Sequence, residues 1–558
     1  VEDQVTYPMS TEMLKVPGAR WVRGMSQFGL SAVFVVFEDD TDLYWARSRV
    51  LEYLNSVRER LPEGARPTLG PDATGVGWVM QYILTDETGA LDLADLRSLQ
   101  DWTVKPALTS VSGVAEIASL GGMQRQYQIV VDPTRLLGLG VALEDVVNAV
   151  RTSNQDVGGR VLELGGTEFV VRGRGRFAGL EDVRSVPVGL GPDGTPVLVS
   201  DVARVEFGPE VRRGIADLDG RGEVVTGFVV MRSGENPLAV IEGVKSRMNE
   251  LEATLAAGVR FVTAYDRSIL IRAAIHTLRE KLLEEALIVA LVTLLFLFHA
   301  RSALVAIVTL PIGILMAFLG MRWLGIGANI MSLGGIAIAI GAMIDAAIVM
   351  VENFHKHMER NERDALGIGH WELVVQASKE VGPALFTSLL LITLSFVPVF
   401  ALEAQEGRLF KPLAWTKTLS MASAALLSIT LVPVLMGPFI RGGVKAENQN
   451  PLNRLMITLY RPLIRVVLRF RWTTLGVASL VLVATLWPWA RLGSEFMPPL
   501  NEGSIMDMPS FQPSIGTAQA KAILQQRDAA MAAIPEVASV LGKVGRAETA
   551  TDMAPMAM

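Results

Sequence analysis

Two kinds of hydrophobic pattern divide the chain. Residues 1 to about 270 alternate between amphipathic helical segments and stretches with apolar residues at every second position, as strands have. From about Lys281 the chain carries six apolar runs, each near the roughly twenty residues that a helix needs to cross a bilayer. These runs are 282–298, 303–323, 328–358, 383–402, 419–440 and 473–490. After about Arg491 the first pattern returns, so the sequence predicts a membrane α-helical bundle together with α+β domains.

Three segments of the α+β regions follow one plan. Near Leu14, Leu108 and Met531 the chain ends a helix, turns through a short Pro or Gly segment and enters a strand. Such units predict split β-α-β, ferredoxin-like subdomains used at least three times. Between about Asn154 and Arg232 strand-forming residues, Gly and Arg replace the helical pattern, which predicts an inserted β hairpin.

The loops between the apolar runs predict the orientation of the bundle. HARS, HKHMERNERD and the segment from Arg441 to Trp472 fall on one side and carry most of the Lys and Arg, whereas LGIGAN and EAQEGR are nearly neutral or acidic. Basic loops stay in the cytoplasm, so both α+β regions are expected outside it. Residues 452–470 alternate apolar and basic side chains, like a helix on the inner membrane surface.

Composition narrows the possible functions. A hydrophobic share of 50% beside 19% charged residues indicates a mixed membrane and soluble protein, and a net charge of -6 without a basic block argues against nucleic acid as a partner. The chain has no cysteine, which excludes disulfides, thiolate metal sites and cysteine nucleophiles. A soft-metal site would need its 23 methionines or five histidines. The sequence shows no phosphate-binding loop, nucleophile elbow or HExxH motif, so an enzyme is the least favoured class.

The apolar run 328–358 carries a charge near its middle, Asp345. A carboxylate at bilayer depth is costly and marks a proton or ion path by default, although it could also only bond a neighbouring helix. At about 100° per residue Glu352 shares its face, while Met343 and Met350 share a face roughly 150° away. Thioethers suit Cu(I), although methionine more often fills a core.

Methionines also gather near the end of the chain. Met506 and Met508 are two residues apart, which predicts a short strand with both side chains on one face. Met553, Met556 and Met558 follow in a second Pro-containing segment. Metal binding and core packing both remain open from the pattern alone.

Five stretches carry a resemblance to a known family: PGARWVRGMSQFG, LGPDATGVGW, ANIMSLGGIAIAIGAMIDAAIVMVENFHKH, LEAQEGRLFKPLAWTKT and GKVGRAETATDMAP. The whole chain resembles proton-driven efflux pumps of the resistance-nodulation-division superfamily, specifically the copper/silver subgroup of the heavy-metal branch. The resemblance implies that Asp345 is the proton-relay carboxylate and that Glu352 supports it. Divalent-metal members have a further Asp where this chain has Ala339, which favours a soft monovalent ion.

The same resemblance implies a metal path made of methionines. It assigns Met508 and Met558 to a periplasmic site whose third methionine lies in a region absent here. It assigns five methionines to a relay through the membrane: Met331, Met343, Met350, Met421 and Met436. One relay methionine of the subgroup is Val211 here. Pro433 is expected to bend the helix between Met421 and Met436.

The resemblance also divides the chain into regions. They are residues 1–77, part of a first porter subdomain; 78–270, a second with the inserted docking segment; 271–442, transmembrane helices two to six; 443–471, the cytoplasmic surface helix; 472–491, transmembrane helix seven; and 492–558, the start of the second porter region. The chain lacks an initiator methionine and stops within TDMAPMAM, so we expect a fragment cut at both ends.

The expected function is export of Cu(I) or Ag(I) from the inner membrane by a secondary antiporter, with a proton gradient as energy source and no permanent cofactor. The resemblance implies a homotrimer in lipid that docks to a periplasmic adaptor and an outer-membrane channel. The alternatives are a divalent-cation pump using Asp507 and Asp552, a drug exporter, and a secretion-assisting membrane protein of the same superfamily.

Overall fold

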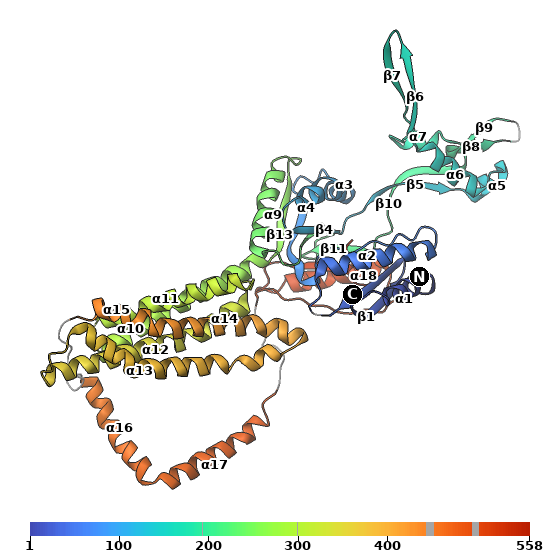
Figure 1. The fold of residues 1–558 in the computed structure, drawn as a ribbon. Coiled ribbons are helices and arrows are strands. Elements are labelled where there is room, and N and C mark those ends of the chain that lie inside the picture. Colours follow the sequence, from blue (N-terminus) through green and yellow to red (C-terminus); the bar gives the residue numbers. More distant parts are fainter. Residues whose placement is uncertain (39, 192–193, 298–299, 442–450, 494–501) are drawn as a thin grey trace. The chain divides into compact units, whose positions relative to one another are not determined.

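The computed structural model describes residues 1–38, 40–191, 194–297, 300–441, 451–493 and 502–558. The chain forms two units (Figure 1). One contains Val1–Ser268 with Met506–Met558 and has mixed helices and strands, and the other contains Ile269–Ile505 and is helical. This agrees with the predicted combination of α+β regions and a helical bundle.

A four-stranded antiparallel sheet forms the largest core of the first unit. Its order is β13 (Val259–Asp266), β3 (Trp78–Asp86), β12 (Val225–Met231), β4 (Val114–Leu120). Strand β12 reads VTGFVVM, and its β-branched side chains are almost all buried, as a central strand requires. Helix α9 (Pro237–Glu252) connects β12 to β13 and packs against this core. Asn236 caps α9 by accepting hydrogen bonds from two backbone N–H groups, and Pro237 occupies the first turn.

The three predicted helix-turn-strand segments are confirmed. Helix α1 (Tyr7–Met13) is followed by β1 (Ala19–Gln27), and β1 pairs with β2 (Leu30–Phe37). Helix α4 (Lys105–Thr109) precedes β4, and α18 (Thr517–Ala532) precedes β14 (Leu541–Gly545).

The inserted hairpin is also confirmed, as β6 (Val157–Leu164) paired with β7 (Thr167–Gly173). Gly165 and Gly166 form its two-residue turn with φ of 62° and 78°. Both positive angles suit the tight turn that matches strand twist, and glycine adopts them without steric cost. Side chains on both faces of the hairpin are exposed.

Segments from opposite ends of the sequence meet in the first unit. Strand β11 (Gly214–Leu218) pairs antiparallel with β14, so that Ile215 lies opposite Val544. Ala520 and Leu524 of α18 pack on these two side chains. The pairing joins a strand before the long apolar helices to the segment that follows them.

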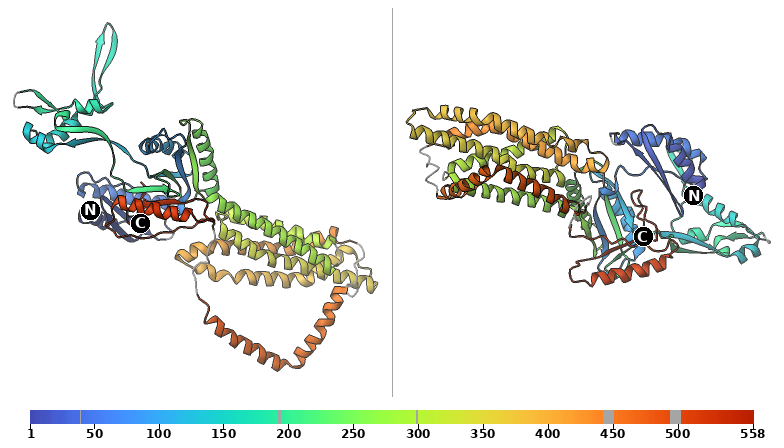
Figure 2. Two further views of the ribbon diagram at one scale, coloured as in Figure 1. Left: turned by 180° about the vertical axis from the view of Figure 1, so that it is seen from behind. Right: turned by 90° about the horizontal axis from the view of Figure 1, so that it is seen from below.

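The second unit consists of long helices, four of which run alongside one another in every view (Figure 2): α11 (Ala300–Trp323), α12 (Ile330–Arg363), α13 (His370–Leu394) and α14 (Ala404–Ile429). Within the described residues, α11, α12, α13 and α17 (Arg471–Trp489) are long and apolar enough to cross a membrane. The pair α14 and α15 (Leu431–Phe439) adds a fifth span if it counts as one.

The first predicted run lies in α10 (Arg267–Leu297), which is helical, and its last residue, 298, falls outside the described part. Its role as a span stays a prediction.

The predicted bend between Met421 and Met436 is confirmed. Helices α14 and α15 meet at an angle of 47°, and the break lies at Thr430. Pro433 explains this position, because a proline ring clashes with the carbonyl four residues earlier, here that of Ile429. The predicted surface helix is α16 (Pro451–Arg469), while residues 442–450 before it lie outside the described part.

The remaining elements complete the two units. They are the helical turns η1 (Glu2–Thr6), η2 (Arg58–Arg60), η3 (Gly75–Gly77), η4 (Gln100–Val104) and η5 (Val397–Ala401); the helices α2 (Leu43–Val57), α3 (Leu93–Leu99), α5 (Pro133–Leu139), α6 (Leu143–Ser153), α7 (Leu180–Arg184) and α8 (Val199–Val202); and the strands β5 (Arg125–Val131), β8 (Pro187–Leu190), β9 (Pro196–Leu198) and β10 (Ala203–Pro209).

Candidate functional site

Helix α12 presents two chemically different faces. Met343 and Met350 are buried against neighbouring helices, whereas Asp345 is exposed on the opposite side. Asn329 begins the helix by accepting a hydrogen bond from the backbone N–H of Ser332, at 2.8 Å. The helix therefore separates its thioethers from its carboxylate, as its sequence predicted.

Four of the five predicted relay methionines lie in two buried apolar clusters, two in each, and the two relay methionines of one cluster are called a pair below. Met350 of α12 and Met436 of α15 belong to one apolar cluster and are both fully buried. Met343 of α12 and Met421 of α14 belong to a second cluster. Each pair joins residues 78 to 86 positions apart in sequence, and each brings two thioethers into one dry environment.

Glycines of α11 and α13 face the two methionines of α12, and only the glycine of α11 is closely approached. A Cβ added to Gly313 of α11 would lie 2.3 Å from the methyl carbon of Met343. A Cβ added to Gly382 of α13 would lie 3.9 Å from the methyl carbon of Met350. A larger residue at position 313 would therefore displace the end of the Met343 side chain, whereas an added Cβ at position 382 would only make an ordinary contact with Met350.

Not every predicted relay residue joins a pair. Met331 is half-buried in the first turn of α12 and belongs to neither cluster. Val211, which replaces a methionine of the subgroup, is exposed. Ala339 is fully buried in the cluster of Met343 and Met421, a dry position at which a carboxylate would be costly.

The two predicted proton-relay carboxylates have different surroundings. In the described part of the chain no residue donates a hydrogen bond to Asp345 or forms an ion pair with it. Glu352 is half-buried and accepts a hydrogen bond from Nζ of Lys356 one turn later, at 2.7 Å. The face of α12 that carries Asp345 is not covered by α11, α13 or α14, and a buried charge there would need a partner from elsewhere.

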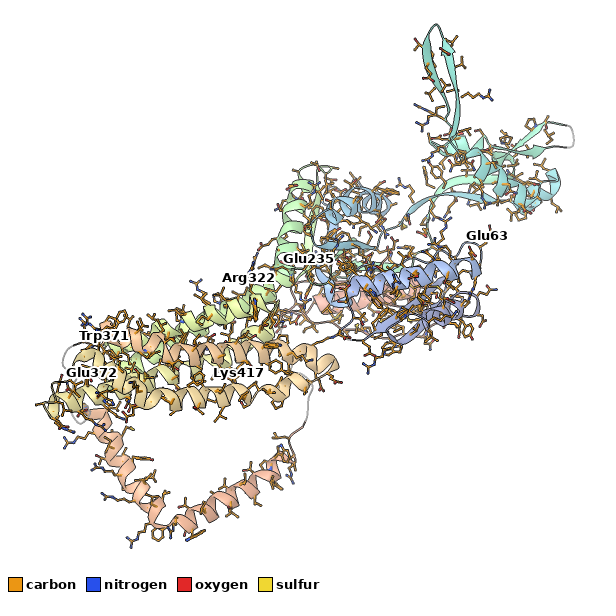
Figure 3. The ribbon with its side chains drawn as sticks, in the orientation of Figure 1. Glu63, Glu235, Arg322, Trp371, Glu372 and Lys417 are labelled. Atoms are coloured by element: carbon orange, nitrogen blue, oxygen red, sulfur yellow. The ribbon has the colours of Figure 1, made fainter. Side chains whose placement is uncertain are left out.

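Sequence reasoning missed two residues near the methionine pairs. Met358 lies in the same buried cluster as Met350 and Met436. The signal in the sequence that could have identified it is its position eight residues after Met350. Lys417 of α14 (labelled in Figure 3) is buried one turn before Met421. Its Nζ lies 3.1 Å from the ring centroid of Phe396. The predicted span began at residue 419, whereas α14 begins at Ala404 and so includes this lysine.

The predicted periplasmic methionines lie on neighbouring segments. The backbone N–H of Phe511 donates to the carbonyl of Ala557 at 2.7 Å, which holds the stretch after Met508 beside the residue preceding Met558. Met508 is 60% exposed and Met558 is 39% exposed. The expected strand at Met506 and Met508 is wrong: these residues are irregular, and no described strand pairs with them to form a ladder.

The carboxylates beside these methionines already have partners. Asp507 forms an ion pair with Arg527. Asp552 is buried, contacts Nζ of Lys543 at 2.5 Å and accepts a hydrogen bond from the backbone N–H of Ala547 at 2.7 Å. The described residues contain no group of three or more His, Asp or Glu placed to hold a metal ion. A metal ion bound by Asp507 or Asp552 would therefore have to displace these partners.

Comparisons with known proteins agree over the whole chain. The sequence profile of the AcrB/AcrD/AcrF family matches residues 1–558. The cation efflux system protein CusA of Escherichia coli K12 and the putative cation efflux system protein SilA of Salmonella typhimurium are each 54% identical over 563 residues, which cover 100% of this chain and 54% of theirs. The cobalt-zinc-cadmium resistance protein CzcA of Cupriavidus metallidurans is 37% identical over 566 residues, covering 99% of this chain and 53% of its own.

A solved structure extends this similarity to the fold. The crystal structure of a heavy metal efflux pump, crystal form II, superposes with a TM-score of 0.85 at 33% identity and covers 100% of this chain and 53% of that one. The chain spans about half the length of the curated relatives it matches.

Proposed function

Because the chain belongs to the AcrB/AcrD/AcrF family, as its resemblance to resistance-nodulation-division pumps predicted, we propose that it carries much of the ion path of a proton-driven antiporter for Cu(I) or Ag(I). The observation that carries this proposal is that two buried apolar clusters along α12 each contain two of the predicted relay methionines, Met350 with Met436 and Met343 with Met421.

The pairs suit a soft monovalent ion for chemical reasons. Thioether sulfur is a polarisable neutral ligand that binds Cu(I) well and Zn(II) poorly. Binding by neutral ligands releases no proton, and it leaves the charge of the ion as the only charge placed in the apolar interior. The two pairs lie about two turns apart on α12, so an ion could move from one to the other along the helix.

Asp345 supplies the proton-coupling group in this proposal. Protonation would neutralise the one carboxylate near the middle of α12 and lower its cost in an apolar environment. Its face of the helix is left uncovered by the neighbouring helices described here, so we infer that it packs against helices of the rest of the pump. A change of that packing would move α12 and with it Met343 and Met350, which couples the proton to the metal path.

Met508 and Met558 would receive the ion outside the membrane. A divalent-cation pump, the second candidate, would use Asp507 and Asp552 there, but both carboxylates are engaged by basic side chains. Breaking those ion pairs would cost a divalent ion part of its binding free energy. The methionines need no such exchange, which favours the soft ion.

The remaining parts of the proposal follow from the family. We infer an inner-membrane location with the α+β unit in the periplasm, ferredoxin-like porter subdomains, and a homotrimer that works with an adaptor and an outer-membrane channel. A secondary transporter of this kind is driven by the proton gradient and performs no enzymatic step.

A chimera tests the proposal. This chain would replace the matching region of E. coli CusA, and cells lacking their own pump would be challenged with Ag(I) and Zn(II). We expect silver resistance that is lost with Asp345→Asn and with Met350→Leu combined with Met436→Leu. A chimera that protects against Zn(II) and is indifferent to the methionine changes would favour the divalent pump, and Asp345→Asn with full resistance would refute proton coupling through this residue.

A further inference from the structure

Two buried carboxylates lie together in the α+β unit, far in sequence from the predicted relay. Asp217 of β11 is 0% exposed, and Asp528 of α18 is 2% exposed. Within the described residues, Oδ1 of Asp217 and Oδ2 of Asp528 are buried without a hydrogen-bond partner. Buried carboxyl oxygens normally have partners, because leaving one unpaired costs free energy.

The backbone explains how the two side chains meet. Asp217 lies opposite Gly542 in the β11–β14 ladder. A Cβ added to Gly542 would lie 1.8 Å from Oδ2 of Asp528, so the carboxyl group of Asp528 rests directly on this glycine. Gln525, one turn before Asp528, donates from Nε2 to Oδ2 of Asp217 at 3.0 Å. Helix α18 thus places its aspartate over the strand position that faces Asp217.

The nearby cations are used by other carboxylates. On α18, Arg527 pairs with Asp507, and Lys521 contacts Glu223 at 2.5 Å. On β14, Lys543 pairs with Asp552. A further charged group that acts on Asp528 is another acid, Asp219, which accepts a hydrogen bond from the backbone N–H of Val540 at 2.8 Å. Since no described cation pairs with either carboxylate, two negative charges here would repel each other in a desolvated site.

We propose that Asp217 and Asp528 form a proton-binding site, in which one proton is shared between them and holds α18 and β14 against β11. The proton supplies the donor that the two unpartnered oxygens lack. The site joins a strand before the membrane helices to the helix and strand after them, so proton binding from the surrounding solution stabilises that junction. This inference does not depend on the transported ion or on Asp345.

The charge environment sets the pH range of this site. Burial is the largest cause that raises the pKa of Asp528, and repulsion from Asp217 and Asp219 raises it further, while Arg527 lowers it. Together these effects raise the pKa from an ordinary value of 3.8 to about 7. Because the folded pKa is the higher one, the stabilisation is complete below about pH 4 and is lost as the pH rises toward 7. Above pH 7 the folded site is itself deprotonated and the loss is complete.

Hydrogen exchange of the full chain in detergent tests the proposal. Peptides covering β11 and β14 report local opening, and the intrinsic pH dependence of exchange is divided out. We expect the opening constant to rise about tenfold per pH unit between pH 5 and 7 and to level off above it. Asp528→Asn, which keeps the shape and removes the titration, should give a flat profile with slower exchange than the unmodified chain at pH 8. Glu536→Gln, an exposed acid just after α18, is the matched control and should leave the profile unchanged.

Two outcomes would overturn the site. A flat profile in the unmodified chain would show that no proton is bound across this range, and a slope that persists in Asp528→Asn would assign the titration to another group. If Asp528→Asn does not fold, Asp217→Asn is measured in its place. It removes the charge repulsion, so the level region should then begin at a lower pH, and an unaltered profile would refute the sharing of the proton.

Discussion

The methionines of the helical bundle and those near the end of the chain have opposite surroundings. Met350 and Met436 are fully buried on helices that other helices hold in place, and the pair Met343 and Met421 is similar. Met508 and Met558 lie on irregular segments, and both keep a large exposed fraction. The same residue type therefore has two structural roles within one proposed ion path.

Buried methionines contribute to the free energy of folding, whereas exposed methionines contribute mainly to the free energy of metal binding. A buried methionine stabilises the fold through apolar burial whether or not metal is present, and its position is fixed before the ion arrives. An exposed methionine contributes little to the fold and must be ordered by the ion, which costs side-chain entropy. The bundle pairs should thus respond to mutation first in stability, and the exposed pair first in metal affinity.

Truncating a bundle methionine should give the largest effect. Met350→Ala removes a fully buried side chain from a cluster of α11, α12, α13 and α15, and we expect a loss of about 2–5 kcal/mol in the free energy of unfolding. Denaturant titration of the detergent-solubilised chain, followed by the loss of helix signal, measures it.

The exposed counterpart provides the contrast. Met508→Ala should change the free energy of unfolding by less than about 0.5 kcal/mol, as surface substitutions usually do. If Met350→Ala were equally mild, the buried pairs would not be part of a packed core and the comparison would fail.

Silver affinity separates sulfur from packing. Met350→Leu with Met436→Leu keeps most of the volume, so its cost in stability should stay near 1–2 kcal/mol, while the loss of both sulfurs removes the site. Met508→Ile with Met558→Ile does the same for the exposed pair. We expect each double variant to remove one class of Ag(I) sites in a calorimetric titration, with affinity at that class lowered at least about tenfold.

Zn(II) serves as the control ion in the same titration. It should bind weakly to every variant, since the carboxylates near Met508 are ion-paired. Zn(II) binding that survives the loss of Met508 and Met558 would point to Asp507 and Asp552, and would reduce the exposed methionines to surface residues.

Metal binding by thioethers should depend little on pH. Thioethers have no proton to lose, so Ag(I) affinity of the intact chain should change by less than about twofold between pH 6 and 8. A site using histidine would lose affinity at the lower pH, because imidazole titrates near pH 6.5. Titrations at three pH values in one buffer of constant ionic strength distinguish the two, and a tenfold change would exclude a site made only of thioethers.

Features that depend on the local spacing of residues could be predicted from the sequence. Features that depend on contacts between distant segments could not. The two faces of α12 follow from the seven-residue spacing of Met343 and Met350 and of Asp345 and Glu352, which helix geometry converts directly into direction. The bend at Thr430 follows from Pro433 in the same way. By contrast, a two-residue spacing suggested a strand at Met506 and Met508, but a strand needs a neighbour to pair with, and local pattern cannot supply that information.

Other features became visible only when distant segments met. Nothing near Asp217 in the sequence indicates Asp528, because they are brought together by the pairing of β11 with β14. Lys417 escaped notice because the apolar run appeared to begin two residues after it, whereas α14 starts thirteen residues before it. Charges at the edge of an apolar run are therefore poorly placed by hydropathy alone.

The smallest predicted loss of silver affinity concerns the glycine that accommodates Met343. Alanine at position 313 favours the helix by about 0.5–1 kcal/mol, but its methyl group would overlap that of Met343 and force this flexible side chain into another rotamer at about the same cost. Gly313→Ala should therefore leave stability nearly unchanged while displacing the sulfur of Met343 within the cluster that also contains Met421. We expect a roughly twofold to fivefold loss of Ag(I) affinity at the bundle sites, which corresponds to a few tenths to 1 kcal/mol.

The control is Gly476→Ala in α17, where an added Cβ meets nothing within 4 Å, and it should leave the Ag(I) affinity unchanged. If Gly313→Ala binds silver as the unmodified chain does, then the position of the Met343 sulfur is not critical and this pair serves packing rather than metal.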